Sequence, residues 1–170
     1  MFEALFDRRL KPTGAFLEEL KAAGYDVQHA QTKYPTGVWT KCLLVARRHR
    51  WGELSEADAF RHIGREFTIG FLETIVGRFV GAAIPFMSAE SFLNRLASYF
   101  RMGREDTRLT FDIVERGKQS ARIVVHNPAA VPGTFVAGMI DVAFERIGTP
   151  GSIEVLQQSP TDYELLVRWQ

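Results

Sequence analysis

The sequence predicts an α+β fold, in which an N-terminal layer of about five helices packs on an antiparallel sheet. Two observations lead to this class. Up to Gly103 the apolar residues recur at intervals of three and four, as they do on one face of a helix. Beyond it they alternate in four short segments, and a further helical pattern separates the first two segments from the last two. Since each hairpin buries only one face, the helices are expected to cover the apolar side of a sheet built as strand, strand, helix, strand, strand.

Length and composition limit the protein classes. The 170 residues fit one domain, residues 1–170, and 46% hydrophobic with 24% charged residues is typical of a globular chain. A net charge of +1 gives no field that would attract nucleic acid. One cysteine and four scattered histidines form no spaced zinc set, so we expect no metal. The sequence shows no secretory leader and no membrane span of about 18 apolar residues, which predicts a cytoplasmic protein.

Caps and stops define the helices of the N-terminal half. Thr13 precedes the first apolar pattern and Gly24 follows it, Pro35 suits the first turn of the next helix, and Ser55 and Ser88 are placed as N-caps of later ones. The predicted helical segments are 13–24, 34–51, one that opens at 55, the stretch 59–84, and 88–103.

The C-terminal half contains the strands. Segments 108–114 and 120–126 alternate and are joined by the polar sequence ERGKQ, so they are predicted to form a β-hairpin. Segment 127–148 returns to helical spacing. Segments 151–158 and 163–169 flank the turn sequence SPTD and are predicted to form a second hairpin.

A series of small residues stands out in the stretch 59–84. Gly70, Thr74, Gly77 and Gly81 are four, three and four residues apart, so they share one face if the segment is a continuous helix. Each internal glycine costs about 0.5 to 1 kcal/mol relative to alanine, which predicts that something packs closely on that face. A neighbouring helix of the same chain, the same helix of a second subunit, or a ligand could do so.

The bulky residues beside this face are assigned to the core rather than to a cofactor pocket. They are Phe67, Phe71, Ile75 and Phe79.

No catalytic residue is assigned. The sequence has no Gly-x-Ser-x-Gly nucleophile elbow and no full phosphate-binding loop, and Cys42 lies on an apolar helix face like a buried thiol. His62 could in principle ligate a haem iron, but a histidine on a helix surface explains it as well. We expect no cofactor.

Three segments carry a family resemblance: FEALFDRRLKPTGAFLEELKAAGYD, AFRHIGREFTIGFLETIVGRFVG, and the tail from Thr134 to Trp169. Over nearly the whole chain they resemble a myxobacterial family of paralogous, functionally uncharacterised proteins of about this length. The order of the elements also resembles 4-vinyl-reductase-type ligand-sensing domains, TRAPP vesicle-tethering subunits and haem nitric-oxide-binding domains. The haem branch carries a Tyr-x-Ser-x-Arg motif, and none of the four tyrosines begins one here.

These observations predict a non-catalytic sensory or protein-interaction domain. The resemblance implies assembly through the helical layer, as a homodimer or with a protein partner. The alternative is a sensor for an apolar small molecule or lipid, with a pocket between helices and sheet. The candidate ligand or interface residues are Trp39, Phe67, Gly70, Phe71, Thr74, Gly77, Arg78 and Gly81.

Overall fold

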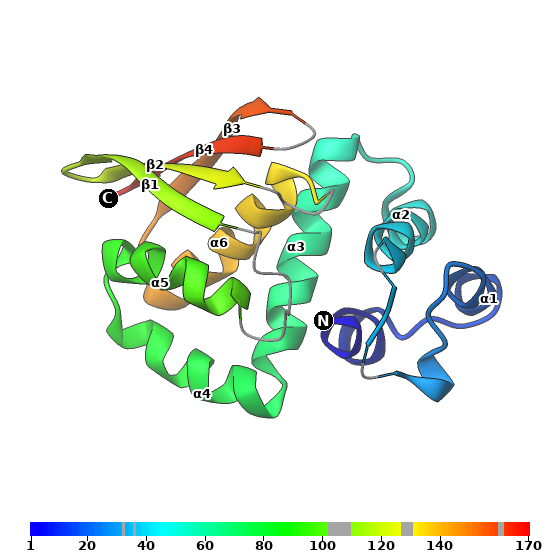
Figure 1. The fold of residues 1–170 in the computed structure, drawn as a ribbon. Coiled ribbons are helices and arrows are strands. Elements are labelled where there is room, and N and C mark those ends of the chain that lie inside the picture. Colours follow the sequence, from blue (N-terminus) through cyan, green and yellow to red (C-terminus); the bar gives the residue numbers. More distant parts are fainter. Residues whose placement is uncertain (32, 36, 102–109, 127–130, 160–161) are drawn as a thin grey trace.

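The computed structural model describes residues 1–31, 33–35, 37–101, 110–126, 131–159 and 162–170 (Figure 1). Its helical segments are η1 (Glu3–Leu10, π-helical), α1 (Ala15–Ala22), the 3₁₀ turn η2 (Val27–His29), α2 (Val38–Trp51), α3 (Glu56–Leu72), α4 (Ile75–Ala83), the 3₁₀ turn η3 (Ile84–Phe86), α5 (Ala89–Arg101) and α6 (Gly133–Ile147). Its strands are β1 (Thr110–Gly117), β2 (Ser120–His126), β3 (Gly151–Gln158) and β4 (Asp162–Trp169).

The four strands form one antiparallel sheet in the order β1-β2-β4-β3. The two hairpins therefore join through β2 and β4, where Ile123 lies opposite Leu165. Alternate residues of these two strands are buried, as the period of two predicts: Ala121, Ile123, Val125, Tyr163, Leu165 and Val167. The α+β class with its antiparallel sheet is confirmed.

The helices form two groups on either side of α3. Figure 1 shows α5 and α6 beneath the sheet, α3 beside α6, and η1, α1 and α2 on the other side of α3. Helix α6 is buried on most of its sides, with Phe135, Val136, Ile140 and Phe144 among the buried residues, because it contacts both α3 and the sheet. Most of the helices before α5 thus reach the sheet only through α3 and α6.

Two of the expected caps are present and one is wrong. The Ser55 hydroxyl accepts a hydrogen bond from the Asp58 N–H (3.1 Å), and Ser88 does the same for Ser91 (3.1 Å). Helix α1, however, starts after Gly14, which has a φ of +56° and gives no side-chain cap, so Thr13 is not the capping residue.

The largest difference from the sequence expectation is a break in the stretch 59–84. Helix α3 ends at Leu72 and α4 begins at Ile75, and the axes of the two arms differ by 100°. The Thr74 hydroxyl accepts from the Gly77 N–H (3.0 Å) and donates to the Phe71 carbonyl oxygen (2.7 Å). Thr74 therefore caps a new helix, and the continuous helix assumed for the small-residue face is wrong.

One further helix was not expected at all. Segment Glu3–Leu10 forms η1, which buries Ala4, Leu5, Phe6 and Leu10 against the rest of the N-terminal group. In the part of the chain that is described, no single helix is both long and apolar enough to cross a membrane; the bent pair of α3 with α4 and η3 meets the length and composition test only when its two arms are counted together.

Candidate functional site

The candidate residues of the glycine series lie against their own chain. A side chain at Gly70 would collide with the Ala4 carbonyl oxygen of η1, and one at Gly77 would collide with the Phe71 carbonyl oxygen at the end of α3. At Gly81 an added Cβ would lie 3.2 Å from Leu72 Cδ2. The close surface predicted for these glycines is therefore present, and it is a neighbouring segment of the same chain.

The other residues of that stretch separate from one another. Phe71 is half-buried in a small cluster with Leu72, Ile84 and Val142, and Arg78 is exposed on α4. The structure does not bring these residues and the glycines to one site.

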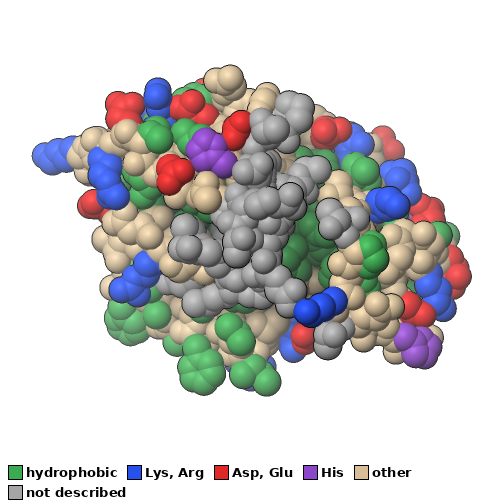
Figure 2. Space-filling model, viewed as in Figure 1, with side chains coloured by type: hydrophobic (Ala, Val, Ile, Leu, Met, Phe, Trp, Pro, Cys, Tyr) green, Lys and Arg blue, Asp and Glu red, His purple; other side chains and the backbone are tan. Residues whose placement is uncertain are grey.

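Helix α4 presents its bulky side chains to solvent. Ile75, Phe79 and Phe86 are 77%, 78% and 90% exposed, and Val76 is 54% exposed. Figure 2 shows hydrophobic side chains projecting from the lower edge of the molecule, where Figure 1 places α4. The assignment of Ile75 and Phe79 to the core is wrong, because the bend after α3 turns their face of α4 outward.

Trp39 and Phe67 lie together in an aromatic cluster where the N-terminal helices meet α3 and α6. The ring centroids of Trp39 are 5.1 Å from Phe2, 5.8 Å from Phe67 and 6.5 Å from Phe135, and Phe67 is 5.6 Å from Phe135. These are the separations at which aromatic rings attract one another. Tyr34 also contacts Phe2, with centroids 4.3 Å apart.

The indole N–H of Trp39 is a buried donor without a partner among the described residues. Trp39 is 9% exposed, and its Nε1 atom makes no hydrogen bond to any residue that the structure describes. A buried indole N–H normally finds an acceptor, since an unsatisfied donor costs about 1 to 3 kcal/mol. Other members of the cluster, namely Phe2, Tyr34 and Phe67, are only half-buried. Figure 2 shows a recess lined by hydrophobic side chains at the position where Figure 1 places α3.

Sequence reasoning missed the crossing of α3 and α6. A side chain at Gly64 would collide with the Phe135 carbonyl oxygen, and one at Gly138 would collide with the Arg61 carbonyl oxygen. The two helices thus meet backbone to backbone, which only glycine permits. Neither glycine belongs to the spaced series, and their pairing has no signal within either helix.

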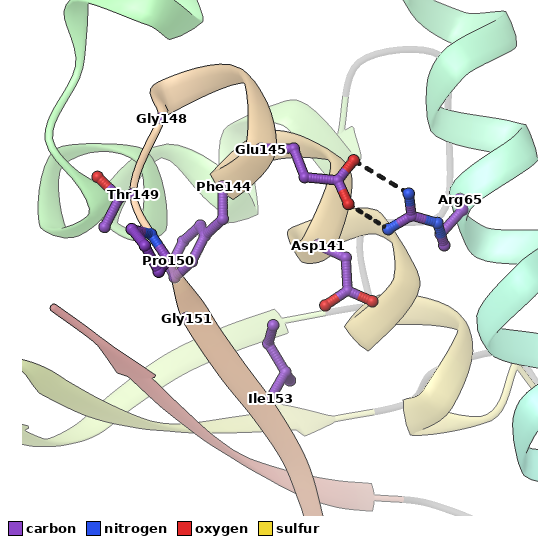
Figure 3. A pocket seen from close by; sticks show the side chains of 9 residues that line it. All are labelled: Arg65, Asp141, Phe144, Glu145, Gly148, Thr149, Pro150, Gly151 and Ile153. Carbon is purple, nitrogen blue, oxygen red and sulfur yellow. Dashed lines mark hydrogen bonds and ion pairs between the residues drawn. The ribbon is translucent and has the colours of Figure 1, made fainter.

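Two ion pairs join α3 to α6 beside this crossing. An open cleft of about 570 Å³ lies next to them (Figure 3). Arg61 donates to both carboxylate oxygens of Asp141 (2.7 and 2.8 Å). These hydrogen bonds raise the pKa of the Arg61 guanidinium. Arg65 makes the equivalent two contacts with Glu145 (2.8 and 3.0 Å), which Figure 3 shows facing each other. Because these charged groups bind one another, they stabilise the helix pair and leave little to attract a ligand.

The described residues offer little for catalysis or metal binding. They contain no group of three or more His, Cys, Asp or Glu side chains that could hold a metal ion. Cys42 is fully buried in α2, and burial raises the pKa of its thiol to about 12, so the reactive thiolate is disfavoured at neutral pH.

The whole chain matches one protein family. The model of the family described as "Protein of unknown function (DUF2378)" matches residues 1–170. A search of curated proteins finds no match. The comparisons give no information on the myxobacterial, 4-vinyl-reductase or TRAPP resemblance, which stays a prediction.

Several solved structures have the same fold at low sequence identity. A point mutant of an H-NOX protein from K. algicida, in its Fe(II) unliganded form, has a TM-score of 0.70 at 14% identity and covers 99% of this chain and 94% of its own. An oxygen-binding H-NOX domain related to soluble guanylate cyclases has a TM-score of 0.66 at 13% identity, covering 90% and 83%. A third structure, from work on haem redox potential and protein-induced porphyrin distortion, has the same TM-score, identity and coverage as the second. At such identities the likeness shows the fold.

The fold of these neighbours implies haem, but the side chains described here do not fit it. All four histidines of the chain are described, and none lies in the core. His29 contacts Asp26, His49 contacts Glu19, His62 is exposed and stacks on Trp51, and His126 contacts Asp162. His62 is therefore no axial ligand, and the protonated Cys42 thiol is a poor one.

Proposed function

For a chain that belongs to the DUF2378 family and has the H-NOX fold, we propose a non-catalytic sensory role in which an apolar small molecule is recognised without haem. The ligand site is the aromatic cluster around Trp39, where the N-terminal helices meet α3 and α6. A cytoplasmic location is part of the proposal.

One observation carries this role: the buried indole N–H of Trp39 has no partner among the described residues and lies inside a cluster whose outer rings remain half-exposed. Apolar walls with a few placed polar groups are the usual composition of a small-molecule site. The rings of Phe67 and Phe135 would contact a flat ligand, and the indole N–H would donate to its carbonyl or ether oxygen. The ligand class is therefore a planar apolar molecule with one hydrogen-bond acceptor.

Native mass spectrometry of freshly purified protein, followed by titration with Nile red, tests the role. Nile red is flat and uncharged and carries a carbonyl acceptor. We expect a co-purified mass or saturable probe binding, and a Trp39→Phe variant that binds the probe about tenfold more weakly, because one hydrogen bond of about 1.4 kcal/mol is lost.

The matched control is Trp51→Phe. Trp51 is half-buried and stacks on His62, away from the cluster. A Phe79→Ser variant removes probe binding to the exposed face of α4. Equal affinity in the Trp39→Phe and Trp51→Phe variants, or neither a bound mass nor saturable binding in the wild type, would contradict the ligand site.

A second role, contact with another protein through the helical layer, is favoured by a different observation. Four large apolar side chains of α4 and η3 are more than half exposed. Contiguous exposed apolar surface commonly marks an interaction site.

A further inference from the structure

We propose that the outward face of α4 and η3, made by Ile75, Val76, Phe79 and Phe86, binds the same face of a second copy of this chain about a two-fold axis. The inference rests on the second of the two roles above and is independent of the ligand site.

The orientation of α4 is the reverse of an ordinary surface helix. Its buried residues include Gly77 and Gly81, which contact the end of α3, and its larger apolar residues point to solvent. An amphipathic helix of a monomer normally turns its bulky apolar side to the core. On the inner side only Val80 packs on the small cluster of Leu72, Ile84 and Val142, and the 100° bend fixes which side faces outward. The described residues of its own chain therefore leave the outward face of α4 uncovered, and a second copy would cover it.

The exposed area suits a small isologous dimer. With about 200 Å² for a phenylalanine side chain, Phe79 and Phe86 at 78% and 90% exposure present roughly 330 Å². The exposed parts of Ile75 and Val76 raise the face to roughly 500 Å², near the upper end of the apolar patches found on monomers. Two such faces bury roughly 1,000 Å², the lower limit for a specific interface. The expected dimer is weak, with a micromolar dissociation constant.

The charges around the face favour a second copy over a lipid surface. Between Glu73 and Glu90 the chain carries a single charged residue, Arg78. Helices that lie on membranes have several Lys or Arg residues that attract anionic headgroups, whereas this face has one cation between two carboxylates. No described residue forms an ion pair with Arg78, whereas Glu73 and Glu90 pair with Arg9 and Arg116 of their own chain, so the face has no group of free cations for anionic headgroups.

Analytical ultracentrifugation of the full chain, from low micromolar to several hundred micromolar concentration, tests the proposal. We expect a monomer–dimer equilibrium in the wild type that the Phe79→Glu variant weakens roughly tenfold or more, because two carboxylates would meet at the axis. Phe79 is 78% exposed, so the melting temperature of the dilute monomer should not change. Val114→Glu is the matched control, since Val114 is 52% exposed on β1 and away from α4.

Cross-linking gives a second readout that does not depend on affinity. Cys42 is the only cysteine and is fully buried, so a Val76→Cys or Phe79→Cys variant adds one accessible thiol. Under copper–phenanthroline these variants should form a disulfide-linked dimer, and a Val114→Cys variant should not. A wild type that stays monomeric throughout, equal cross-linking at Val114, or binding to phosphatidylcholine vesicles without self-association would each overturn the two-fold interface. None of these results alters the Nile red test, so the two proposals fail separately.

Discussion

Glycine has opposite consequences at the α3–α6 crossing and in α4. At the crossing, Gly64 and Gly138 allow two helices to touch along their backbones, and large residues such as Phe135 and Ile140 fill the core beside them. In α4, Gly77 and Gly81 let a short helix lie flat on the end of α3, while its large residues face away from the core. The first arrangement closes the fold and the second opens a surface.

The difference lies in what covers the bulky side of each helix. The far side of α6 meets the sheet, so the crossing is enclosed by a second layer. Helix α4 follows a 100° bend and has no described element over its outward face. A glycine-rich helical sequence therefore identifies a close contact, but the position of the helix in the fold determines whether that contact stabilises the core or exposes a binding surface.

The crossing should be the position most sensitive to substitution. A Gly64→Ala change places a methyl group against the Phe135 carbonyl oxygen, and neither backbone can move without displacing a whole helix. We expect the free energy of unfolding to fall by about 3 kcal/mol or more, measured by urea denaturation.

Gly138→Ala acts on the same crossing and should cost a similar amount. The double variant should cost less than the sum of the two, because the helices separate only once. Additive losses, or a Gly64→Ala variant as stable as the wild type, would mean that the helices do not meet there.

Within α4 the two glycines should differ from each other. A methyl group at Gly77 meets the Phe71 carbonyl oxygen, while one at Gly81 lies 3.2 Å from the Leu72 side chain, which can rotate away. We expect Gly77→Ala to lower the free energy of unfolding by about 2 kcal/mol. Gly81→Ala should be near neutral, because its gain in helix propensity of about 0.5 to 1 kcal/mol offsets the cost of moving the Leu72 side chain. Equal effects in a thermal melt would show that α4 does not rest on the end of α3.

The change of hydrophobic period predicted the sheet and the helix between its hairpins. The alternating residues of β2, such as Ile123, and of β4, such as Leu165, are buried as expected. A half-buried strand shows its inner face directly in the sequence, because every second residue is apolar. Part of the first predicted strand, including Leu109, lies outside the described residues.

The bend and the crossing could not be predicted in the same way. The helical spacing of apolar residues continues through Thr74, because α3 and α4 each satisfy it separately. A threonine three residues before Gly77 is nevertheless a capping signal in the sequence. The partnership of Gly64 with Gly138 depends on how distant segments pack, which no local pattern specifies. Phe79 has the same local pattern as a core residue, so only the three-dimensional path of the chain shows that it is exposed.

The stability of the N-terminal helices should also depend on pH. Tyr25 is fully buried, and its hydroxyl donates to Asp7 of η1 at 2.7 Å. Burial raises the pKa of the Asp7 carboxyl above its ordinary value of 3.8, although the Tyr25 hydrogen bond acts in the opposite direction. The folded state then holds this proton more tightly than the unfolded state, so the free energy of unfolding falls as pH rises from 3.8 through the raised pKa.

An Asp7→Asn variant keeps an acceptor for Tyr25 and has no proton to lose. It should therefore lack this part of the pH dependence in urea titrations at several pH values. The matched control is Asp58→Asn, at an exposed capping position of α3. A wild type and an Asp7→Asn variant with parallel pH profiles would show that partial burial does not raise the pKa of the Asp7 carboxyl.

The smallest effect on folding is expected on the open face, and it separates the two regions most directly. Phe79 contributes little to the core of the monomer, so Phe79→Ser should change the free energy of unfolding of the dilute protein by less than about 0.5 kcal/mol. The same truncation at the enclosed Phe135, which is 3% exposed, should cost about 3 to 5 kcal/mol. If Phe79→Ser destabilises the monomer by a comparable amount in urea denaturation, then a part of the chain covers α4, and its outward face is core. If only the concentration dependence of the melting temperature disappears, the face stabilises the dimer and not the fold, because association adds to the apparent stability only when the protein is concentrated.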